Sequence, residues 1–275
     1  MFDEPAAIDG RETVPAGDAA QSYGAVVVVG GGCYGGYYVR QLQRAVRAGA
    51  LRVDEIRVVD RDSDCAVARD SVRPAEPWAA QVRFVVQEWR AFFDEYLDHA
   101  ADRGAATADA IVPSPLMPHL MGEWLVRRAR DRWPERAVET VPLETVPAVP
   151  WERAGTGGTH YVSFATWMCP VNCVEPRVCP HTRAERSWSL PTTIDRYARD
   201  EAAASPAVLF CRHRAYGVGM FDTNEVVAAD AIIARAGSEG PAEVVIGTVS
   251  HCHGALTRLR IGGEPGAAPG TGAAR

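Results

Sequence analysis

The feature that most constrains the fold is a continuous apolar run, Ala25–Val29, which passes directly into a glycine-rich loop. A β-branched run without polar alternation is typical of a strand that is buried on both faces. Residues 34–48 then place Tyr38 and Leu42 on one face of a helix, and Gly49 provides its C-terminal stop. Strand, tight turn and amphipathic helix predict the first unit of a parallel α/β sheet.

The same alternation continues along the first half of the chain. The pattern predicts strands over residues 56–60, 82–86, 110–112 and 137–141, and helices over 89–103 and 119–133. Strands that alternate with helices predict a parallel sheet covered by helices on both faces. In the second half we expect strands over 160–166, 207–211 and 244–249 and a helix over 224–236. Periodicity leaves open whether this half is a separate α+β unit or continues the sheet.

Composition along the chain divides it into four parts. Residues 1–22 and 262–275 are rich in small residues and are expected to be disordered tails. A Pro- and Gly-rich stretch over 142–158 has little to pack, which predicts a boundary near residue 150. The expected organisation is a nucleotide-binding domain over 23–150 and a smaller Cys-rich α+β region over 151–261.

Charge and lysine usage exclude several classes of protein. The 275 residues have a net charge of −6, which argues against nucleic acid or an anionic membrane as the main partner. The sequence contains no lysine, so it cannot form a Schiff base with pyridoxal phosphate or a P-loop that ends in GKS or GKT. We find no secretory signal and no apolar run long enough for a membrane helix, and therefore expect a cytoplasmic protein with reduced cysteines.

The glycine-rich loop has the spacing of a phosphate-binding turn. Gly30, Gly32 and Gly35 form a GxGxxG pattern between the predicted strand and helix. Gly30 permits the tight turn, Gly32 lets the backbone approach a pyrophosphate, and Gly35 lets the helix pack close to the strand. Asp60, at the end of the second strand, could accept hydrogen bonds from a ribose. Cys33 is expected to line the same nucleotide site.

In these features the sequence resembles the Rossmann dinucleotide-binding superfamily over roughly residues 24–145. The resemblance implies binding of NAD or NADP, with FAD as the alternative, on the helix N-terminus. Arg61 beside Asp60 could instead favour a 2′-phosphate. Two other interpretations stay open: an S-adenosylmethionine site, although the acid that usually precedes those glycines is missing, and a glycine-rich turn that binds nothing.

A cluster of cysteines gives the strongest chemical signal in the second half. Cys169, Cys173 and Cys179 follow the spacing C-x3-C-x5-C, and prolines follow the first and third. Proline fixes φ and stiffens a loop, and Cys-Pro steps recur around iron–sulfur ligands. We expect the three thiols to hold an iron–sulfur cluster, such as a [4Fe-4S] centre. A zinc ion is the alternative, and redox thiols or packing without metal are a third.

Two cysteines are candidates for a fourth ligand. Cys252 ranks first because His251 and His253 flank it, and Cys211 ranks second at the end of a predicted strand. Cys65 is expected to be a packing residue. Arginines near the cysteines, at positions 177, 183, 186, 212 and 214, form either a solvated basic face or an anion site.

Together these features predict a nucleotide-binding iron–sulfur oxidoreductase that acts with a small-molecule substrate or a redox partner protein. His119, after the fourth strand near Ser114, is a weak candidate for a general acid or base. A non-catalytic accessory protein that senses redox state or metal, with a nucleotide site, is the main alternative. A zinc-stabilised enzyme that transfers a nucleotide sugar or a methyl group ranks third.

Overall fold

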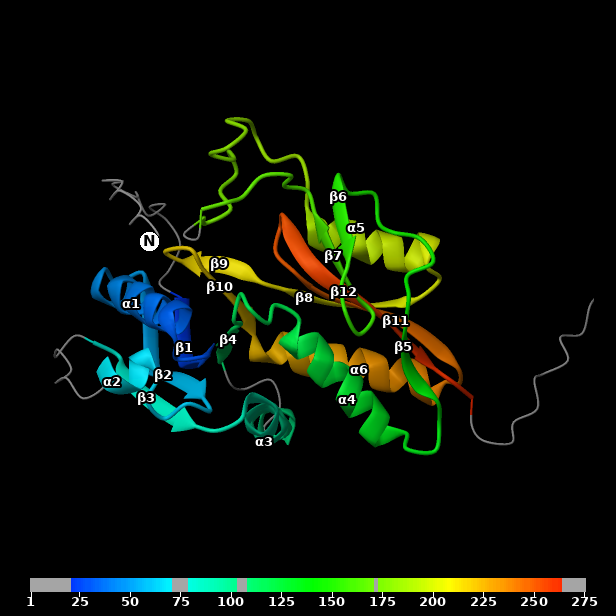
Figure 1. Cartoon of the computed structure of the whole chain (residues 1–275), viewed down its shortest axis with the longest axis horizontal. Helices are drawn as coiled ribbons and strands as arrows, with labels where there is room; N and C mark the ends of the chain where they lie inside the picture. The colour runs from blue at the N-terminus through cyan, green and yellow to red at the C-terminus, as the bar shows by residue number, and fades with distance from the viewer. Residues whose placement is uncertain (1–20, 71–78, 103–107, 171–172, 264–275) are drawn as a thin grey trace, which may run out of the picture.

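The computed structural model of the protein describes residues 21–70, 79–102, 108–170 and 173–263. Residues 1–20 and 264–275, which make up most of the two expected tails, lie outside the described residues. The described part is a mixed α/β structure with two six-stranded sheets and six α-helices (Figure 1).

The first sheet combines strands from both halves of the sequence. Its order is β3-β2-β1-β4-β10-β9. The first four strands pair in parallel, whereas β10 joins β4 and β9 in antiparallel fashion. Their bounds are β3 (Gln81–Val86), β2 (Leu51–Asp60), β1 (Gln21–Val29), β4 (Ala110–Val112), β10 (Val218–Asp222) and β9 (Arg212–Ala215).

Alternate residues of β1 bury against different layers, as expected for a central strand. Val26 and Val28 pack with Leu42 of α1 (Cys33–Arg47) and Val67 of α2 (Ala66–Asp70). Val27 and Val29 point to the other face, where α3 (Trp89–Asp102) packs. The continuous apolar run therefore exists because helices cover both faces of the sheet.

The second sheet is mostly antiparallel. Its order is β6-β7-β12-β11-β8, and β5 also pairs with β12; β8 and β11 form the one parallel pair within it among the described strands. The strands are β6 (Trp151–Ala154), β7 (Thr159–Ser163), β12 (His253–Ile261), β11 (Ala242–Val249), β8 (Ser205–Phe210) and β5 (Val138–Val141).

Helices cover both faces of the second sheet as well. One face packs on α4 (Leu120–Arg132) and α6 (Thr223–Ser238). The other packs on α5 (Leu190–Arg196) and the π-helical turn η2 (Tyr197–Glu201), where Ile194 and Tyr197 are fully buried. Figure 1 shows α4 and α6 together below this sheet, with α6 reaching towards the first sheet.

A single buried cluster joins the two sheets. It contains Val27 of β1 and Phe93 of α3 together with Ile246 of β11 and Ile233 of α6. The expected boundary at residue 150 does not coincide with the division between the sheets. β5 precedes it but belongs to the second sheet, and β9 and β10 follow it but complete the first.

Residues 142–158, expected to contain little structure, include strand β6, whose four residues are all exposed. β6 is held by antiparallel backbone pairing with β7 and not by burial of its side chains. Its residues therefore show no apolar pattern from which a strand could be predicted. None of the described helices has the length and apolar character that crossing a bilayer would require.

Candidate functional site

A cavity of about 570 Å³ lies where the two sheets meet. Tyr38 of α1 and Ser114, in the loop after β4, line it from the first half of the chain. The segment after β7, the β8–β10 strands and the turn between β11 and β12 line the rest. Thiol, imidazole, carboxylate and hydroxyl side chains meet here, namely those of Cys169, Cys173, Glu175, Cys211, His213, Thr248, Ser250 and His253.

The glycine loop has the geometry that its three glycines predict. Gly30 adopts a φ of +87°, a conformation that L side chains rarely take. A Cβ atom on Gly35 would lie 1.8 Å from the carbonyl oxygen of Gly30, so only glycine lets α1 start this close to the strand. A Cβ on Gly32 would meet no atom within 4 Å, so this residue faces open space at the N-cap of α1. Cys33, the first residue of the helix, is exposed.

Asp60 lies beside the glycine loop and holds it. Its carboxylate accepts a hydrogen bond of 2.7 Å from the N–H of Gly31, and its other oxygen accepts one from the N–H of Asp62. Gly31 is a constraint that the spacing pattern did not single out, because a Cβ there would lie 2.3 Å from the sulfur of Cys65. Cys65 is buried, as expected of a packing residue.

Cys169, Cys173 and Cys179 belong to the segment between β7 and α5, which we call the cysteine loop. Both ends of this loop are anchored to the turn between β11 and β12. At its start the N–H of Phe164 donates to the carbonyl of Cys252, and at its end the N–H of Leu190 donates to that of His251. Between these points the chain folds back on itself, with the N–H of Cys179 donating to Ala184. These bonds hold the described part of the loop next to the β11–β12 turn.

The three thiols of the loop lie close enough to influence one another. Burial, followed by the charge of Cys173, raises the pKa of the Cys169 thiol, and Cys179 adds to the increase. Burial also raises the pKa of Cys173. Around Cys179, burial acts to raise the pKa of the thiol, but hydrogen bonds from Thr182 and His181 and the charge of Arg186 together outweigh it, so the pKa is lowered. Only Cys169 and Cys173 line the cavity.

The two candidates for a fourth ligand occupy different places. Cys211 lines the cavity together with Cys169 and Cys173. Cys252 is 7% exposed, and its sulfur accepts a hydrogen bond of 3.4 Å from the indole N–H of Trp188. Cys252 still lies near Cys169, whose charge helps to raise the pKa of the Cys252 thiol, although burial is the main cause.

Among the described residues, no group of three or more His, Cys, Asp or Glu side chains is already arranged to hold a metal ion. A metal bound by the cavity thiols would therefore require side chains to turn towards it. The iron–sulfur cluster and its ligand set remain predictions from the sequence.

Glu175 lines the cavity, and the sequence analysis did not identify it as a site residue. Its carboxylate accepts hydrogen bonds from the hydroxyl of Ser250 at 2.6 Å and the N–H of His251 at 3.0 Å. Burial acts to raise the pKa of this carboxyl, but the nearby His213 and the two hydrogen bonds outweigh burial and lower the pKa. Glu175 thereby ties the cysteine loop to the β11–β12 turn.

His213 is a second residue that sequence reasoning missed. Its Nδ1 hydrogen-bonds to the carbonyl oxygen of Cys173, and its ring faces Cys211 across Gly219. The available signal was the short spacing of Cys211 and His213; in the structure Cys211 lies between β8 and β9, and His213 lies on β9. For Glu175 the sequence carried no comparable signal.

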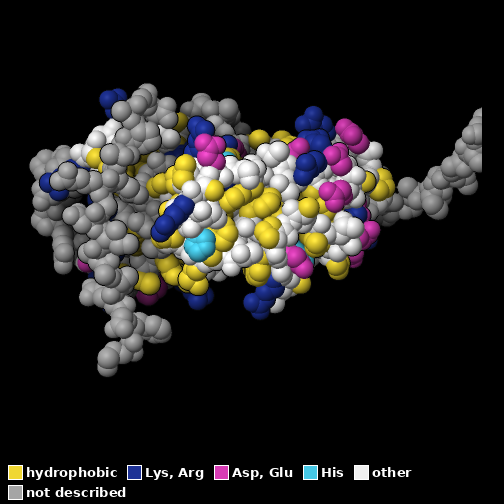
Figure 2. All heavy atoms as spheres, turned by 90° about the horizontal axis from the view of Figure 1, so that it is seen from above, with side chains coloured by type: hydrophobic (Ala, Val, Ile, Leu, Met, Phe, Trp, Pro, Cys, Tyr) yellow, Lys and Arg dark blue, Asp and Glu magenta, His cyan; other side chains and the backbone are white. Residues whose placement is uncertain are grey.

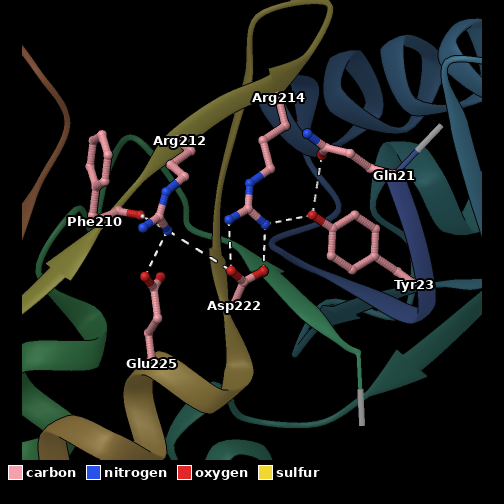
Figure 3. A network of polar contacts seen from close by, with 7 residues as sticks. All are labelled: Gln21, Tyr23, Phe210, Arg212, Arg214, Asp222 and Glu225. Atoms are coloured by element: carbon pink, nitrogen blue, oxygen red, sulfur yellow. Dashed lines mark hydrogen bonds and ion pairs between the residues drawn. The ribbon is translucent and has the colours of Figure 1, made fainter. Parts of the chain in front are cut away.

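A network of polar contacts fixes the β9–β10 strands that carry His213 (Figure 3). The guanidinium of Arg214 pairs with both carboxylate oxygens of Asp222 and also contacts the hydroxyl of Tyr23 on β1. Arg212 binds Glu225 of α6 at 2.7 Å. Both arginines are therefore paired with carboxylates, and neither forms the anion site that the sequence left open.

Two further arginines of the expected basic face, Arg177 and Arg186, have different roles. Arg177 is 82% exposed and pairs with Glu185, which is the behaviour of a solvated charge. Arg186 contacts the backbone carbonyls of Glu175 and Pro176, so it helps to shape the cysteine loop.

His119 lies behind the cavity and not in it. It is 4% exposed, and its ring nitrogens bond to the hydroxyls of Thr248 at 2.7 Å and Thr257 at 2.8 Å. Burial lowers the pKa of His119 to about 4. Ser114, by contrast, lines the cavity. The structure thus gives His119 a place in the core, and its proposed acid–base role stays a prediction.

The rim of the cavity is apolar. Met168 is 96% exposed and Trp151 is 42% exposed, and both line the opening. Figure 2 shows hydrophobic side chains spread over the middle of the face seen from above, with charged side chains more frequent towards one end.

With this geometry defined, the chain can be compared with known proteins. A family model described as an uncharacterized protein, C-terminal domain (AF_1314_C), matches residues 121–262, slightly more than half of the chain. The chain belongs to this family. No curated protein and no solved structure matches it.

The AF_1314_C region begins in α4 and ends just after β12. It contains the cysteine loop, the whole second sheet and the β9–β10 strands of the first sheet. The cavity residues that it leaves out are Tyr38 of α1 and four residues of the loop after β4, namely Pro113, Ser114, Pro115 and Pro118. The glycine loop lies outside the AF_1314_C match as well.

Proposed function

We propose that this protein is a nucleotide-binding oxidoreductase whose cysteine loop holds an iron–sulfur cluster. The observation that carries the proposal is that one cavity is lined by both halves of the predicted machinery. Tyr38 comes from the helix that the glycine loop opens, and Cys169 and Cys173 come from the cysteine loop. Neither the glycine loop itself nor Asp60 lines this cavity, so the proposal requires the nucleotide to extend from the loop past Tyr38 to reach the thiols.

The nucleotide half rests on topology and loop geometry. The parallel strand order β3-β2-β1-β4 supports the proposed Rossmann-like half-sheet, a type of sheet in which ligands bind at the carboxyl ends of the strands. The open face of Gly32 leaves room for a phosphate at the N-terminus of α1, where free N–H groups favour negative charge. NAD or NADP is the proposed ligand, with FAD as the alternative.

The cluster half rests on the chemistry of the donors. Cys169, Cys173 and Cys211 present thiols to one cavity, and Cys179 lies beside it in the same loop. The sulfur of Cys211 packs directly against Gly219, where an added Cβ would lie 2.7 Å from it. Soft thiolate donors are those that iron–sulfur clusters use. When bound, such a cluster supplies one-electron transfer.

The surrounding residues define what the protein itself contributes. The apolar rim, with Met168 and Trp151, would exclude water around a small-molecule substrate. Glu175 fixes the loop and places a negative charge on the cavity floor. A nicotinamide transfers two electrons and a cluster usually one, so the proposal includes either a bound flavin or a redox partner protein as the intermediary.

The test is purification of the full chain without oxygen, followed by analysis of iron, sulfide and zinc and by titration with NAD(H), NADP(H) and FAD. Broad visible absorbance with matching iron and sulfide is the expected result, and Cys169→Ser and Cys173→Ser should reduce both contents. A colourless protein with stoichiometric zinc, or with no metal, would overturn the cluster. Absence of binding for all three nucleotides would overturn the nucleotide half.

A further inference from the structure

Glu175 places a buried carboxylate in the wall of the cavity. The residue is 9% exposed, so its charge is largely withdrawn from water. One carboxylate oxygen accepts a hydrogen bond of 2.6 Å from the hydroxyl of Ser250, and the other accepts one of 3.0 Å from the N–H of His251. The thiol of Cys252 also lies beside this carboxylate. A carboxylate can accept about four hydrogen bonds, so Glu175 keeps acceptor capacity for a further donor.

Among the described residues, no arginine forms an ion pair with the Glu175 carboxylate. Arg186 contacts the backbone carbonyl of Glu175 and not its side chain. Arg212 and Arg214 are occupied by carboxylates of α6 and β10. A buried charge is costly unless hydrogen bonds and an opposite charge compensate for it. A positively charged ligand in the cavity would supply the opposite charge.

The backbone of Glu175 is held in an uncommon conformation. Its φ is +49°, in the left-handed region that few residues other than glycine, asparagine and aspartate adopt. Such a conformation persists where surrounding contacts fix it. Here the bonds from Ser250 and His251 fix the side chain, and Arg186 fixes the backbone carbonyl. The carboxylate is therefore positioned before a ligand arrives, which lowers the entropic cost of binding.

The rest of the cavity lining adds apolar surface without a compensating charge. Among the described residues that line it, Glu175 is the only aspartate, glutamate or arginine. The other polar lining groups are thiols, hydroxyls and imidazoles, none of which carries a permanent positive charge. Trp151, Trp167 and Met168 contribute aromatic and apolar side chains. Aromatic faces attract cations, and apolar surface favours contact with hydrocarbon groups.

This lining suits an organic cation better than a metal ion. A hard metal ion needs several oxygen donors around it, and no group of three or more His, Cys, Asp or Glu side chains is so arranged in the part of the chain that the structure describes. An organic ammonium group needs one carboxylate for its N–H donors and apolar surface for its carbon atoms. The cavity volume of about 570 Å³ is that of a site for a small molecule.

We propose that the cavity binds a small organic amine in its ammonium form, with the nitrogen at the Glu175 carboxylate and the carbon skeleton against Trp151 and Met168. This inference rests on the proposed function, because it names the class of small-molecule substrate for the same cavity. Amine binding is measured separately from iron, sulfide and nucleotide binding, so the two proposals can fail separately.

Calorimetric titration of the full chain, purified without oxygen, tests the assignment. Benzylamine and hexylamine are the probes, and both are ammonium ions at neutral pH. Benzyl alcohol and hexanol are their neutral counterparts of similar shape. Each amine should bind about ten-fold more tightly than its alcohol, or tighter still, because a charge-assisted hydrogen bond is stronger than a neutral one.

Glu175→Gln removes the charge but keeps the size of the side chain. It should lower the affinity for both amines by about ten-fold or more and leave the affinity for the alcohols unchanged. Glu185→Gln is the matched control, because Glu185 belongs to the same loop but is 66% exposed and pairs with Arg177. This variant should leave all four affinities unchanged. Circular dichroism of each variant checks that the fold is retained.

The comparison of amines with alcohols in the wild-type protein decides the proposal even if Glu175→Gln does not fold. Equal affinities for amine and alcohol, or absence of binding by both amines, would overturn the cation site. An unchanged amine affinity in folded Glu175→Gln, or an equal loss in Glu185→Gln, would overturn the role of Glu175. Selective amine binding by a protein without iron, sulfide or nucleotide binding would support the cation site and overturn the proposed function.

Discussion

Both ring nitrogens of His119 bond to threonine hydroxyls in the core, and this makes the residue a source of pH dependence. A threonine hydroxyl can donate or accept, so in the neutral ring one nitrogen donates to a hydroxyl and the other accepts from one. Burial lowers the pKa of His119 to about 4, below the value of about 6.5 for an unfolded chain. Between these values the unfolded state binds more protons than the folded state, so stability falls as pH falls.

We therefore expect the free energy of unfolding to decrease by up to about 3 kcal/mol, from this group, as pH drops from 6.5 to 4. Urea unfolding at a series of pH values measures it. His119→Gln retains a neutral hydrogen-bonding side chain but no titration, so its stability should depend less on pH across this window. An equal slope in wild type and His119→Gln would contradict the prediction.

Gly35 is a second residue whose identity the geometry dictates. An added Cβ would lie 1.8 Å from the Gly30 carbonyl oxygen, and backbone cannot move aside as a side chain can. Gly35→Ala should therefore lower the free energy of unfolding by about 1–3 kcal/mol, the usual cost of overpacking. Gly32→Ser is the control, because nothing lies within 4 Å of its Cβ and serine favours the N-cap. Equal losses in both variants would argue against the clash.

A second substitution at Gly32 tests nucleotide binding independently of folding. A bulky residue at position 32 would extend into the space proposed for the phosphate, and its Cβ would have no atom within 4 Å. Gly32→Phe is expected to fold normally, as judged by circular dichroism, and to lose nucleotide binding in calorimetric titration. Unchanged affinity in a folded Gly32→Phe protein would show that the loop is merely structural.

At the scale of the elements, β9 and β10 are positioned by charge as much as by apolar burial. Arg212 and Arg214 of β9 are paired with carboxylates, and the side chain of Arg214 is 11% exposed. The partner Asp222 is the last residue of β10 and the N-cap of α6. Since Arg214 occupies its carboxylate, Asp222 links strand, helix and β1 instead of capping the helix with its side chain.

Arg214→Met should lower the free energy of unfolding by about 1–3 kcal/mol, because it leaves a carboxylate and a phenol without their charged donor. Asp222→Asn should lower it less, since Asp222 is 37% exposed. The double variant should lose less than the sum of the two single variants. Additive losses in denaturant unfolding would mean that the pair contributes no coupling.

For the molecule as a whole, the two sheets share one buried core. Apolar residues of β1, α3, α4, α6, β8, β11 and β12 belong to a single cluster. The first sheet also needs β9 and β10, which begin 100 or more residues after the end of β4. These arrangements make the two halves parts of one folding unit.

A fragment of residues 23–150 is therefore expected not to fold by itself, whereas the full chain should unfold in one transition. Tryptophan fluorescence and circular dichroism should give coincident denaturation curves for the full chain. Dispersed nuclear magnetic resonance spectra from the isolated fragment, or two separate transitions in the full chain, would contradict this expectation.

Local patterns in the sequence predicted much of the first half. The apolar run of β1, the amphipathic helix α1 and the three glycines record local requirements: burial on both faces, a positive φ and a close backbone approach. The predicted helix over 119–133 and the strand over 244–249 lie within two residues of α4 and β11. These elements have strong periodicity or continuous apolar character, which a sequence displays directly.

The sequence by itself determined the α/β character and the presence of a glycine loop and clustered thiols. Only the tertiary structure decided which of these meet. β9, β10 and β12 were missed because their residues are held by pairing with distant strands, a property that local pattern does not encode. The same long-range pairing brings Cys211 and His213 to Cys169, Cys173 and Glu175, which no spacing in the sequence could have indicated.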